Sequence, residues 1–593
     1  CFCRSAPAPA RQPCRWVTAM AGPGGASTDS PVLFFNGLIL SVSADGTVKR
    51  SKWLRIQAGL VAQLGQGRPP PGAREGAAER DLQGAVVLPG LGDSHVHIYS
   101  LGKQRRSVDL TGCNSIEELQ ARLRPHAEEA RAGGVLLLEG TGWDQNLLGR
   151  DPTRADLDAI VGDRPCVVHR RCWHAATASS AALRICGALP DTPDVEGGVV
   201  ERGPDGPTGL LRERAIETVL KPLLEMEEPP ELQREILHEG LMECVRRGIT
   251  QVQSNDGKQL GNITNPWKAY SDLEAEGKLP CRVFLTVPYM EAGNGFQPNG
   301  PTQHPSGLLS CGRVKLWTDG AMGASTAALL EPYSDDPEAK NVGVLQLSLE
   351  EISKAVVDAK AKGLRVEAHT IGDRSAKLLL EAFEKHLTPA DRPILTHCQV
   401  LNDDLVSRMV AAGAVANVQP QFVPSDLPVA ARRLGEGSER FRYAYAWRTL
   451  LRRGVRLAGG SDSPVEEPAP LVGMADAMDH VLHEGERLTF AEALEIYTAG
   501  AAFAAGVEDR LGRLEPGLAA DLVLVHMPRG EEDEAWLPDS NALREAQVLE
   551  VYVQGRLVHS GAPAPPPPFC FGAANGKGGL IGRWRRGRCP CCR

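Results

Sequence analysis

Eight short apolar segments, separated by longer segments with a helical pattern, are the feature that most constrains the fold of this chain. The short segments have the length of strands, whereas stretches such as LEEISKAVVDAKAKG repeat apolar residues every three or four positions and end in glycine. Alternation of strands and helices is typical of βα units around a parallel sheet, and eight such units close into a barrel. The pattern predicts an α/β fold, a TIM-like (β/α)8 barrel, with strands in residues 85–97, 248–255, 281–289, 313–319, 364–370, 394–398, 414–420 and 455–462.

Two parts of the chain do not fit this barrel. The segment 101–223 is too long for a simple βα connection, and we expect it to be an insertion that packs over the barrel mouth. Strands that alternate between apolar and polar residues occur near both ends of the chain, a pattern typical of half-exposed strands. We predict a composite small β-sandwich from residues 31–86 and 515–560, and a barrel domain from residues 87–514 that contains the insertion.

The two ends of the chain have compositions that do not favour a packed core. Residues 1–30 are rich in Ala, Pro, Ser and Arg, as organelle transit peptides are, and an unstructured or mistranslated leader explains this composition equally well. The chain begins with Cys1, so Met20 is a candidate start. Residues 561–593 combine a proline run with GRWRRGRCPCC, and we expect a disordered tail because CPCC lacks a second pair of metal ligands.

The composition predicts a soluble protein without nucleic-acid or membrane partners. Hydrophobic residues make up 42% and charged residues 23% of the chain, and a net charge of -9 argues against broad nucleic-acid binding. The apolar stretches are shorter than the ~18 residues that a membrane crossing needs. The cysteines outside the two tails are dispersed singly, which predicts reduced thiols and favours the cytoplasm, unless the leader directs the chain to an organelle. Homo-oligomerisation stays open.

The first chemical signal is the pair His95 and His97 at the end of the first predicted strand. Residues i and i+2 of a strand face the same side, so the two imidazoles converge on one point, as binding of a metal ion requires. The spacing alone occurs by chance in many proteins. Its position directly after the apolar run AVVLPG makes it a much stronger indication of a metal site.

Three further ligand candidates close later strands: His369, His397 and Asp462. Each taken alone has a structural alternative, a hydrogen-bonded histidine or a turn carboxylate. Because the carboxyl ends of the strands meet at one mouth of a parallel barrel, we expect them to form one centre with the upstream histidine pair. Imidazole with some carboxylate suits a borderline divalent cation, above all zinc, and points to metal-assisted hydrolysis.

An ordered series of motifs extends this pattern over nearly the whole chain, from Val32 to Ser560. The motifs are LPGLGDSHVH, DGAMGASTAAL, AHTIGDR, THCQV, GGSDSPV and GRLEPGLAADLVLV. With them the chain resembles the amidohydrolase superfamily, specifically amidohydrolase family 3, the YtcJ-like branch. The resemblance implies a TIM-like barrel with a composite β-sandwich, and an enzyme that hydrolyses carbon–nitrogen bonds other than peptide bonds, typically in an amide or N-acyl compound.

The resemblance also implies a role for Lys315 in GRVKLWTDG. In this superfamily a lysine at the end of the fourth strand can be carboxylated and bridge two metal ions. A cation repels an ammonium, so a ligand role needs the carbamate, which only the neutral amine forms. With the carbamate we expect two ions, one held by the paired histidines and Asp462 and the other by the two later histidines; without it we expect one. The alternative for Lys315 is an ion pair, with Asp319 as a candidate partner.

Four residues are candidates for contacting a small amide-like substrate. Trp143 and His174 lie in the insertion, where they would line the pocket. Asp319 follows Lys315, and Arg374, beside Asp373 in the motif IGDR, offers a bidentate fork for a carboxylate. A salt bridge within the loop is an equally good explanation of the last pair.

We therefore predict a metal-dependent hydrolase in which metal-bound hydroxide attacks the substrate and Asp462 acts as general base and then as general acid. A deaminase or a cyclic amidase on the same fold would use the same ligands. A non-catalytic metal-binding scaffold is the alternative of another class, and the intact ligand set counts against it. The second predicted strand departs from the family, because Gln253 and Ser254 stand where relatives often carry histidine and aspartate. We expect no metal ligand from that strand.

Overall fold

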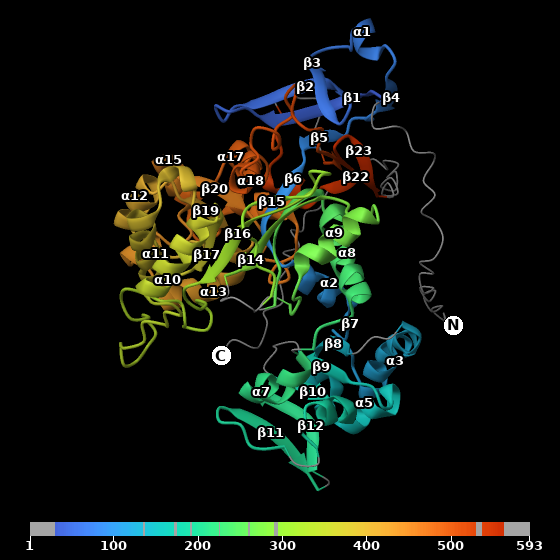
Figure 1. The fold of residues 1–593 in the computed structure, drawn as a ribbon, viewed down its shortest axis with the longest axis vertical. Helices are drawn as coiled ribbons and strands as arrows, with labels where there is room; N and C mark the ends of the chain where they lie inside the picture. Colours follow the sequence, from blue (N-terminus) through green and yellow to red (C-terminus); the bar gives the residue numbers. More distant parts are fainter. Residues whose placement is uncertain are drawn as a thin grey trace, which may run out of the picture.

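The structure, a computed structural model, consists of a barrel with a small sheet at one end and an insertion at the other (Figure 1). It describes residues 30–133, 137–170, 175–189, 192–204, 206–224, 226–258, 261–289, 295–528 and 536–561. The predicted leader and C-terminal tail lie outside the described residues, apart from Ser30 and Gly561. The division into domains stays a prediction.

The barrel contains all eight predicted strand positions, which confirms the TIM-like fold. Every neighbouring pair along the sheet is parallel. In the described part of the chain the strands follow the order β20-β19-β18-β17-β16-β14-β13-β6, with β15 (Thr302–Gln303) attached to β16. Their bounds are β6 Leu91–Val96, β13 Ile249–Asn255, β14 Arg282–Pro288, β16 Leu309–Trp317, β17 Arg365–Thr370, β18 Ile394–His397, β19 Val415–Val418 and β20 Arg456–Gly459.

The barrel closes just beyond the end of β20, where the chain meets β6. The backbone N–H of Asp462 donates to the carbonyl of His95 at 2.8 Å, and the N–H of His97 donates to the carbonyl of Ser463 at 2.9 Å. Asp93 in β6 strengthens this seam by accepting hydrogen bonds from the backbone and the hydroxyl of Ser461. Closure therefore places Asp462 directly beside the two histidines of the first strand.

The first predicted strand, residues 85–97, is wrong as a single barrel strand, because it forms two strands in different sheets. β5 (Val86–Pro89) pairs with strands of the small sheet, whereas β6 pairs with β13. The chain changes sheets at Gly90, where a Cβ atom would overlap the side chain of Thr250. The apolar run of β5 extends across the break to Leu91, the first residue of β6, so hydrophobicity alone does not reveal the break.

Both ends of the chain contribute to the small sheet, whose order in the described residues is β23-β22-β21-β5-β1-β2-β3, with β4 paired to β1. The N-terminal strands and the C-terminal strands meet where β5 pairs with β21. We describe it as one hydrogen-bonded sheet, and the two-layer sandwich stays a prediction. The remaining bounds are β1 Val32–Val42, β2 Val48–Gln57, β3 Leu60–Gly65, α1 Pro71–Arg74, β4 Ala78–Asp81, β21 Leu522–His526, β22 Gln547–Val553 and β23 Arg556–Ser560.

The insertion has its own mixed sheet and hydrophobic cores, and it lies beyond the end of the barrel opposite the small sheet (Figure 1). Its strands follow the order β11-β12-β10-β9-β8-β7 in the described residues. The strands are β7 Val108–Asp109, β8 Leu138–Trp143, β9 Cys166–Arg170, β10 Ala175–Ala178, β11 Gly198–Gly203 and β12 Gly206–Glu213. The helices are α3 Ile116–Gly133, α4 Gln145–Leu148, α5 Arg154–Val161, α6 Ser180–Ile185 and α7 Arg214–Leu224.

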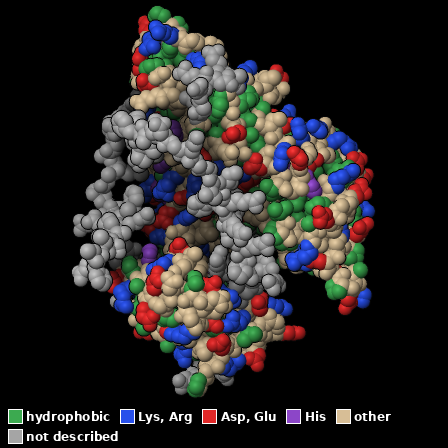
Figure 2. Space-filling model, turned by 180° about the vertical axis from the view of Figure 1, so that it is seen from behind, with side chains coloured by type: hydrophobic (Ala, Val, Ile, Leu, Met, Phe, Trp, Pro, Cys, Tyr) green, Lys and Arg blue, Asp and Glu red, His purple; other side chains and the backbone are tan. Residues whose placement is uncertain are grey.

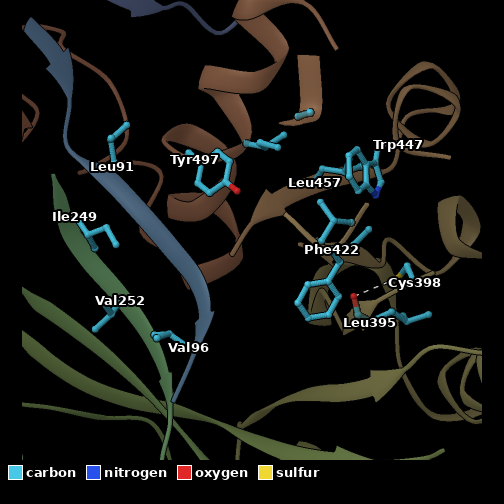
Figure 3. Packing of buried hydrophobic residues seen from close by; sticks show 14 of the residues in the cluster. Leu91, Val96, Ile249, Val252, Leu395, Cys398, Phe422, Trp447, Leu457 and Tyr497 are labelled. Atoms are coloured by element: carbon cyan, nitrogen blue, oxygen red, sulfur yellow. Dashed lines mark hydrogen bonds between the residues drawn. The ribbon is translucent and has the colours of Figure 1, made fainter. Parts of the chain in front are cut away.

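Helices pack around the barrel and enclose its core. Figure 3 shows Leu91 of β6 and Ile249 of β13 among these buried side chains, and also Phe422 and Trp447 from the helical layer. The helices outside the insertion and after β6 are α2 Ile98–Arg106, α8 Pro230–Arg246, α9 Pro266–Ala275, α10 Leu349–Ala361, α11 Asp373–His386, α12 Asp403–Ala411, α13 Phe422–Leu434, α14 Glu439–Arg442, α15 Trp447–Arg453, α16 Pro470–Asp479, α17 Phe490–Ile496, α18 Ala499–Ala505 and α19 Ser540–Arg544. Single 3-10 turns occur at Pro389–Asp391 and Glu484–Glu486.

Charged side chains of both signs are interspersed over the face of the molecule shown in Figure 2. None of the helices in the described part of the chain combines the length and the apolarity that a membrane crossing requires. The cysteines of the described residues are free thiols and all but Cys186 are buried. Burial raises the pKa of the Cys398 thiol, so it stays protonated and packs as a small apolar group.

Helix α2 begins directly after His97 and lies very close to α8. A Cβ atom at Gly102 would overlap the carbonyl group of Ile236, and one at Gly240 would lie 2.5 Å from the carbonyl oxygen of Ile98. We expect Gly102→Ala to lower the free energy of unfolding by about 1–3 kcal/mol, because the two backbones must separate. Urea unfolding measures this change. Gly72→Ala is the matched control, since its Cβ would meet open space; an equal loss in both variants would contradict the close-approach explanation.

Candidate metal centre

Four histidines and one aspartate converge at the carboxyl-terminal mouth of the barrel. His95 and His97 lie at the end of β6, His369 lies in β17, His397 ends β18, and Asp462 follows β20. Ligand atoms of His95, His397 and Asp462 all lie within 4.8 Å of one another. The structure thus brings together side chains that are as much as 367 residues apart in the sequence, from His95 to Asp462 (462 − 95 = 367). Their role as metal ligands stays a prediction.

Asp462 holds the central position in this group. Its Oδ1 atom lies 3.1 Å from Nε2 of His97 and 3.4 Å from Nε2 of His95. The ring of His397 lies 5.6 Å from that of His95 and 4.5 Å from that of His369, measured between centroids. Burial alone would raise the pKa of Asp462, but hydrogen bonds from His95 and His97 hold that pKa well below its usual range. An ionised carboxylate therefore faces the imidazole nitrogens.

Hydrogen bonds on the outer side of three rings orient them toward the centre. Each Nδ1 donates to an oxygen atom, so Nε2 is the nitrogen that faces the centre. It holds a proton when it donates to Asp462, and it carries the lone pair that a metal ligand needs once that proton is lost. The pairs are His95 Nδ1 with Glu367 Oε1 at 2.7 Å, His97 Nδ1 with Asn255 O at 2.9 Å, and His397 Nδ1 with Gln419 Oε1 at 2.8 Å. Neighbouring strands thus select both the tautomer and the direction of each ring.

His369 is oriented in the opposite sense. Its Nε2 donates to the carbonyl of Gly320 at 3.0 Å and lies 3.6 Å from Oδ1 of Asp319, which leaves Nδ1 as the nitrogen available to a ligand. Burial, together with the positive charge of Lys315, lowers the pKa of His369 to about 4. The imidazole is therefore neutral at pH 7, as metal binding requires.

The backbone turns sharply at two of the candidate ligands. His397 has a φ of 82° and Asp462 a φ of 56°, both in the left-handed region that residues other than glycine adopt uncommonly. Such strained conformations cluster at functional sites. Gly460 permits the approach of the last strand, because a Cβ atom there would lie 2.7 Å from the backbone nitrogen of His95. A side chain at position 460 would therefore push the last strand away from the first.

Lys315 points into the same centre and pairs with Glu367, a residue that the sequence analysis missed. Its Nζ lies 3.3 Å from Oε1 of Glu367 and 3.2 Å from Nε2 of His95, and both partners of the ion pair are buried. The ion pair is thus made with Glu367 and not with Asp319. Burial lowers the pKa of Lys315, which favours the neutral amine. Burial would raise the pKa of Glu367, but Lys315 and His95 hold it well below its usual range, so this carboxyl stays ionised.

Strand alternation is the signal that would have found Glu367. It stands two residues before His369 in β17, so both side chains face the same side of the strand. A charged residue between the apolar Val366 and Ala368 of a barrel strand indicates a paired group inside the barrel. In the structure Thr396 donates to its Oε1 atom at 3.2 Å, and Arg313 lies 3.4 Å from its Oε2 atom.

The second barrel strand also supports the centre, through Asn255. Its carbonyl accepts the hydrogen bond from His97, and its Nδ2 atom lies 3.0 Å from Nδ1 of His95 and 3.4 Å from Oε1 of Glu367. The predicted positions on this strand point elsewhere: the amide of Gln253 donates to Ala501 at 2.8 Å. We expected no metal ligand from this strand, and the structure assigns it to orienting two histidines.

The predicted substrate-contacting residues lie in different surroundings. Asp319 is buried and accepts hydrogen bonds from the backbone of Ala328, Ile371 and Gly372; burial raises its pKa to about 6. Arg374 is half-buried at the start of α11, and no ion pair joins its guanidinium to another described residue.

Of the two candidates from the insertion, the structure describes Trp143 but not His174. Trp143 is fully buried in a core of the insertion and donates its indole N–H to the carbonyl of Val168 at 3.0 Å. His174 lies outside the described residues. Contacts of either residue with a substrate stay predictions.

The donor set fits a divalent cation. The imidazoles of His95, His97 and His397 each have a hydrogen bond on the side away from the centre. The imidazole of His369 is neutral because it is buried, and the carboxylate of Asp462 is ionised. Burial and the charge of Lys315 would lower the pKa of His95, but its contacts with Asp462 and Glu367 outweigh them and raise that pKa. A cation would occupy the same place as this extra proton. Zinc stays a prediction, since nitrogen and oxygen donors of this kind also suit other divalent ions.

Comparison with known proteins relates this geometry to a family of hydrolases. A family model described as the amidohydrolase family matches residues 78–559. The chain is 33% identical over 497 residues to the YtcJ protein of Bacillus subtilis (strain 168), an alignment that covers 81% of this chain and 90% of that protein. It is 26% identical over 553 residues to an N-substituted formamide deformylase of Arthrobacter pascens, covering 89% and 98% of the two chains.

A solved structure matches the fold over most of this chain. The crystal structure of an uncharacterized metal-dependent hydrolase from Pyrococcus furiosus is 30% identical in sequence and superposes with a TM-score of 0.70. The match covers 83% of this chain and 98% of that one. The likeness therefore extends over most of both chains.

Proposed function

This chain belongs to the amidohydrolase family, and on that premise we propose that it hydrolyses a non-peptide carbon–nitrogen bond of an amide or N-acyl compound. The observation that carries the proposal is the ionised Asp462, 3.1 Å and 3.4 Å from ring nitrogens of His97 and His95 whose opposite nitrogens are already hydrogen-bonded. A relative named as an N-substituted formamide deformylase supports the choice of bond.

His95, His97, His397, His369 and Asp462 would hold the cation. A divalent ion bound there supplies a Lewis acid that polarises a carbonyl group and lowers the pKa of a water molecule. Asp462 is placed to accept the proton of the attacking water and to return it to the leaving nitrogen, which departs as the amine.

Lys315 decides the number of ions in this proposal. Its burial favours the neutral amine that reacts with carbon dioxide to give a carbamate. As a carbamate Lys315 would bridge two ions; as an ammonium group it would remain in its ion pair with Glu367. We propose the bridging carbamate for the metal-loaded protein.

A substrate panel tests the activity. Metal-loaded protein is incubated with N-formyl amines, N-acyl amines, cyclic amides and exocyclic amino heterocycles, and the released carboxylate, amine or ammonia is measured. Release of an amine and a carboxylate in equal amounts supports the proposal. Ammonia release from the heterocycles alone would assign a deaminase, ring opening alone would assign a cyclic amidase, and metal-loaded protein that turns over none of the compounds would favour a binding scaffold.

Metal content tests the carbamate. We expect about two ions per chain in wild type loaded in the presence of bicarbonate and about one in Lys315→Ala, because the bridging ligand is lost. Mass spectrometry of the metals measures the stoichiometry. Short carboxylic acids should restore the second ion in Lys315→Ala, and the exposed Lys354→Ala should keep both. Equal metal content in wild type and Lys315→Ala would contradict the bridging role.

A further inference from the structure

A second cavity lies at the opposite, amino-terminal mouth of the barrel. Its volume is about 1040 Å³, which is the upper part of the range for small-molecule sites. Arg282 at the start of β14 and Arg365 at the start of β17 line one side, and the turn at Gly59 in the small sheet lines another. The candidate metal centre lies at the other ends of the same barrel strands.

The charged side chains that line this cavity are all positive. Four arginines line it, and among its described lining residues there is no aspartate or glutamate. Arg282 is compensated, since its guanidinium binds both carboxylate oxygens of Asp521, at 2.6 Å and 3.1 Å. Arg510 is exposed at the rim and has only a distant contact with Asp509 at 3.9 Å.

Arg313 carries a buried guanidinium group that lacks hydrogen-bond partners. It is 4% exposed, and its Nη1 and Nη2 atoms have no hydrogen-bond partner among the described residues. Its nearest carboxylate oxygen, Oε2 of Glu367 at 3.4 Å, belongs to a group that already binds Lys315. A buried charged donor without a hydrogen bond is costly and rare.

The neighbouring strand adds to the positive charge. Arg313 and Arg365 are paired directly across β16 and β17, and like charges in such a pair repel each other. Arg365 donates to the carbonyls of Ala504 and Arg392, which satisfies hydrogen bonds without neutralising the charge. Its Nε atom is buried and has no hydrogen-bond partner among the described residues.

We propose that this cavity is a binding site for a small organic oxyanion, whose carboxylate or phosphate group is held by Arg313 and Arg365. A planar guanidinium fork matches the oxygens of either group. Thr302, Gln303 and Ser310 of the lining supply neutral polar groups for the rest of the molecule. The site is distinct from the hydrolytic centre, yet Arg313 touches Glu367, so an occupant would also affect the carboxylate that positions Lys315 and His95.

Calorimetric titration of the metal-loaded protein tests the site. Sodium sulfate, sodium phosphate and sodium succinate are compared at constant ionic strength, which separates tetrahedral oxyanions from dicarboxylates. We expect saturable binding of at least one of these anions. Ser310→Glu, which places a negative charge in the lining, should weaken it at least about tenfold, and Arg510→Gln should weaken it less.

Arg184→Gln is the matched control, because Arg184 in the insertion is as exposed as Arg510, with side-chain exposures of 53% and 55%. Its anion affinity should equal that of wild type. The proposal is overturned if wild type binds none of the three anions, or if binding is unchanged in both Ser310→Glu and Arg313→Met, which would place the anion elsewhere, for example at the metal centre.

Discussion

Replacing Asp462 by asparagine is expected to lower kcat/KM of the metal-loaded enzyme by on the order of 10³-fold. The carboxylate is ionised and lies next to His95 and His97, whereas a neutral amide accepts no proton from water at pH 7. The measurement is hydrolysis of whichever amide the panel identifies. Metal content is determined on the same sample, because a loss of both would indicate that Asp462 acts mainly as a ligand.

Asp476→Asn provides the control for this substitution. Asp476 is a buried carboxylate in α16 that pairs with Arg544 at 2.8 Å, away from the candidate centre. We expect it to keep its catalytic activity while it loses some stability. A kcat/KM of Asp462→Asn within about tenfold of wild type, with the metal retained, would contradict a role in proton transfer.

The second large effect concerns the stability of the metal-free protein. We expect Glu367→Gln to lower the free energy of unfolding by about 3 kcal/mol, because it leaves Lys315 and Arg313 buried without their shared carboxylate. Urea unfolding in the presence of a chelator measures this loss. Glu550→Gln is the control, since Glu550 is also buried but its partner Arg80 is half-exposed and can be solvated by water, so its loss should be smaller.

A double-mutant cycle identifies the source of the loss. Adding Lys315→Met to Glu367→Gln removes one of the unpaired charges, so the double variant should be more stable than the sum of the single changes predicts. Strict additivity, or a Glu367→Gln loss no larger than that of Glu550→Gln, would contradict the importance of this ion pair. The result also bears on the carbamate, because a carboxylated Lys315 would no longer need Glu367 as a counter-ion.

Much of the barrel follows from local patterns. The predicted strands are short, largely apolar runs that end near a polar group, and the helical segments between them repeat apolar residues every three or four positions. The order of strands and helices is therefore encoded in segments of fewer than about 20 residues. Strand-end positions also predicted the convergence of His369, His397 and Asp462. The division of the first strand at Gly90 was missed, because both β5 and β6 are fully buried and follow each other with only Gly90 between them.

The supporting residues of the centre were harder to predict. Asn255 and Gln419 orient histidines through hydrogen bonds between strands that are far apart in the sequence. Glu367 was detectable from its alternation with His369, but its partners Lys315 and Arg313 lie on another strand. Polar residues of these types are as common on surfaces as in sites, so identity and spacing do not distinguish their roles.

The sequence by itself determined the barrel, the family resemblance and the candidate ligands, because these depend on periodicity and on motifs within single segments. Only the tertiary structure decided which nitrogen of each histidine faces the centre, which carboxylate pairs with Lys315, and that Arg313 lines a second cavity. The physical reason is that these properties arise from contacts between strands closed into a ring. A small displacement of one strand relative to its neighbours would alter these hydrogen bonds, although the sequence pattern would stay the same.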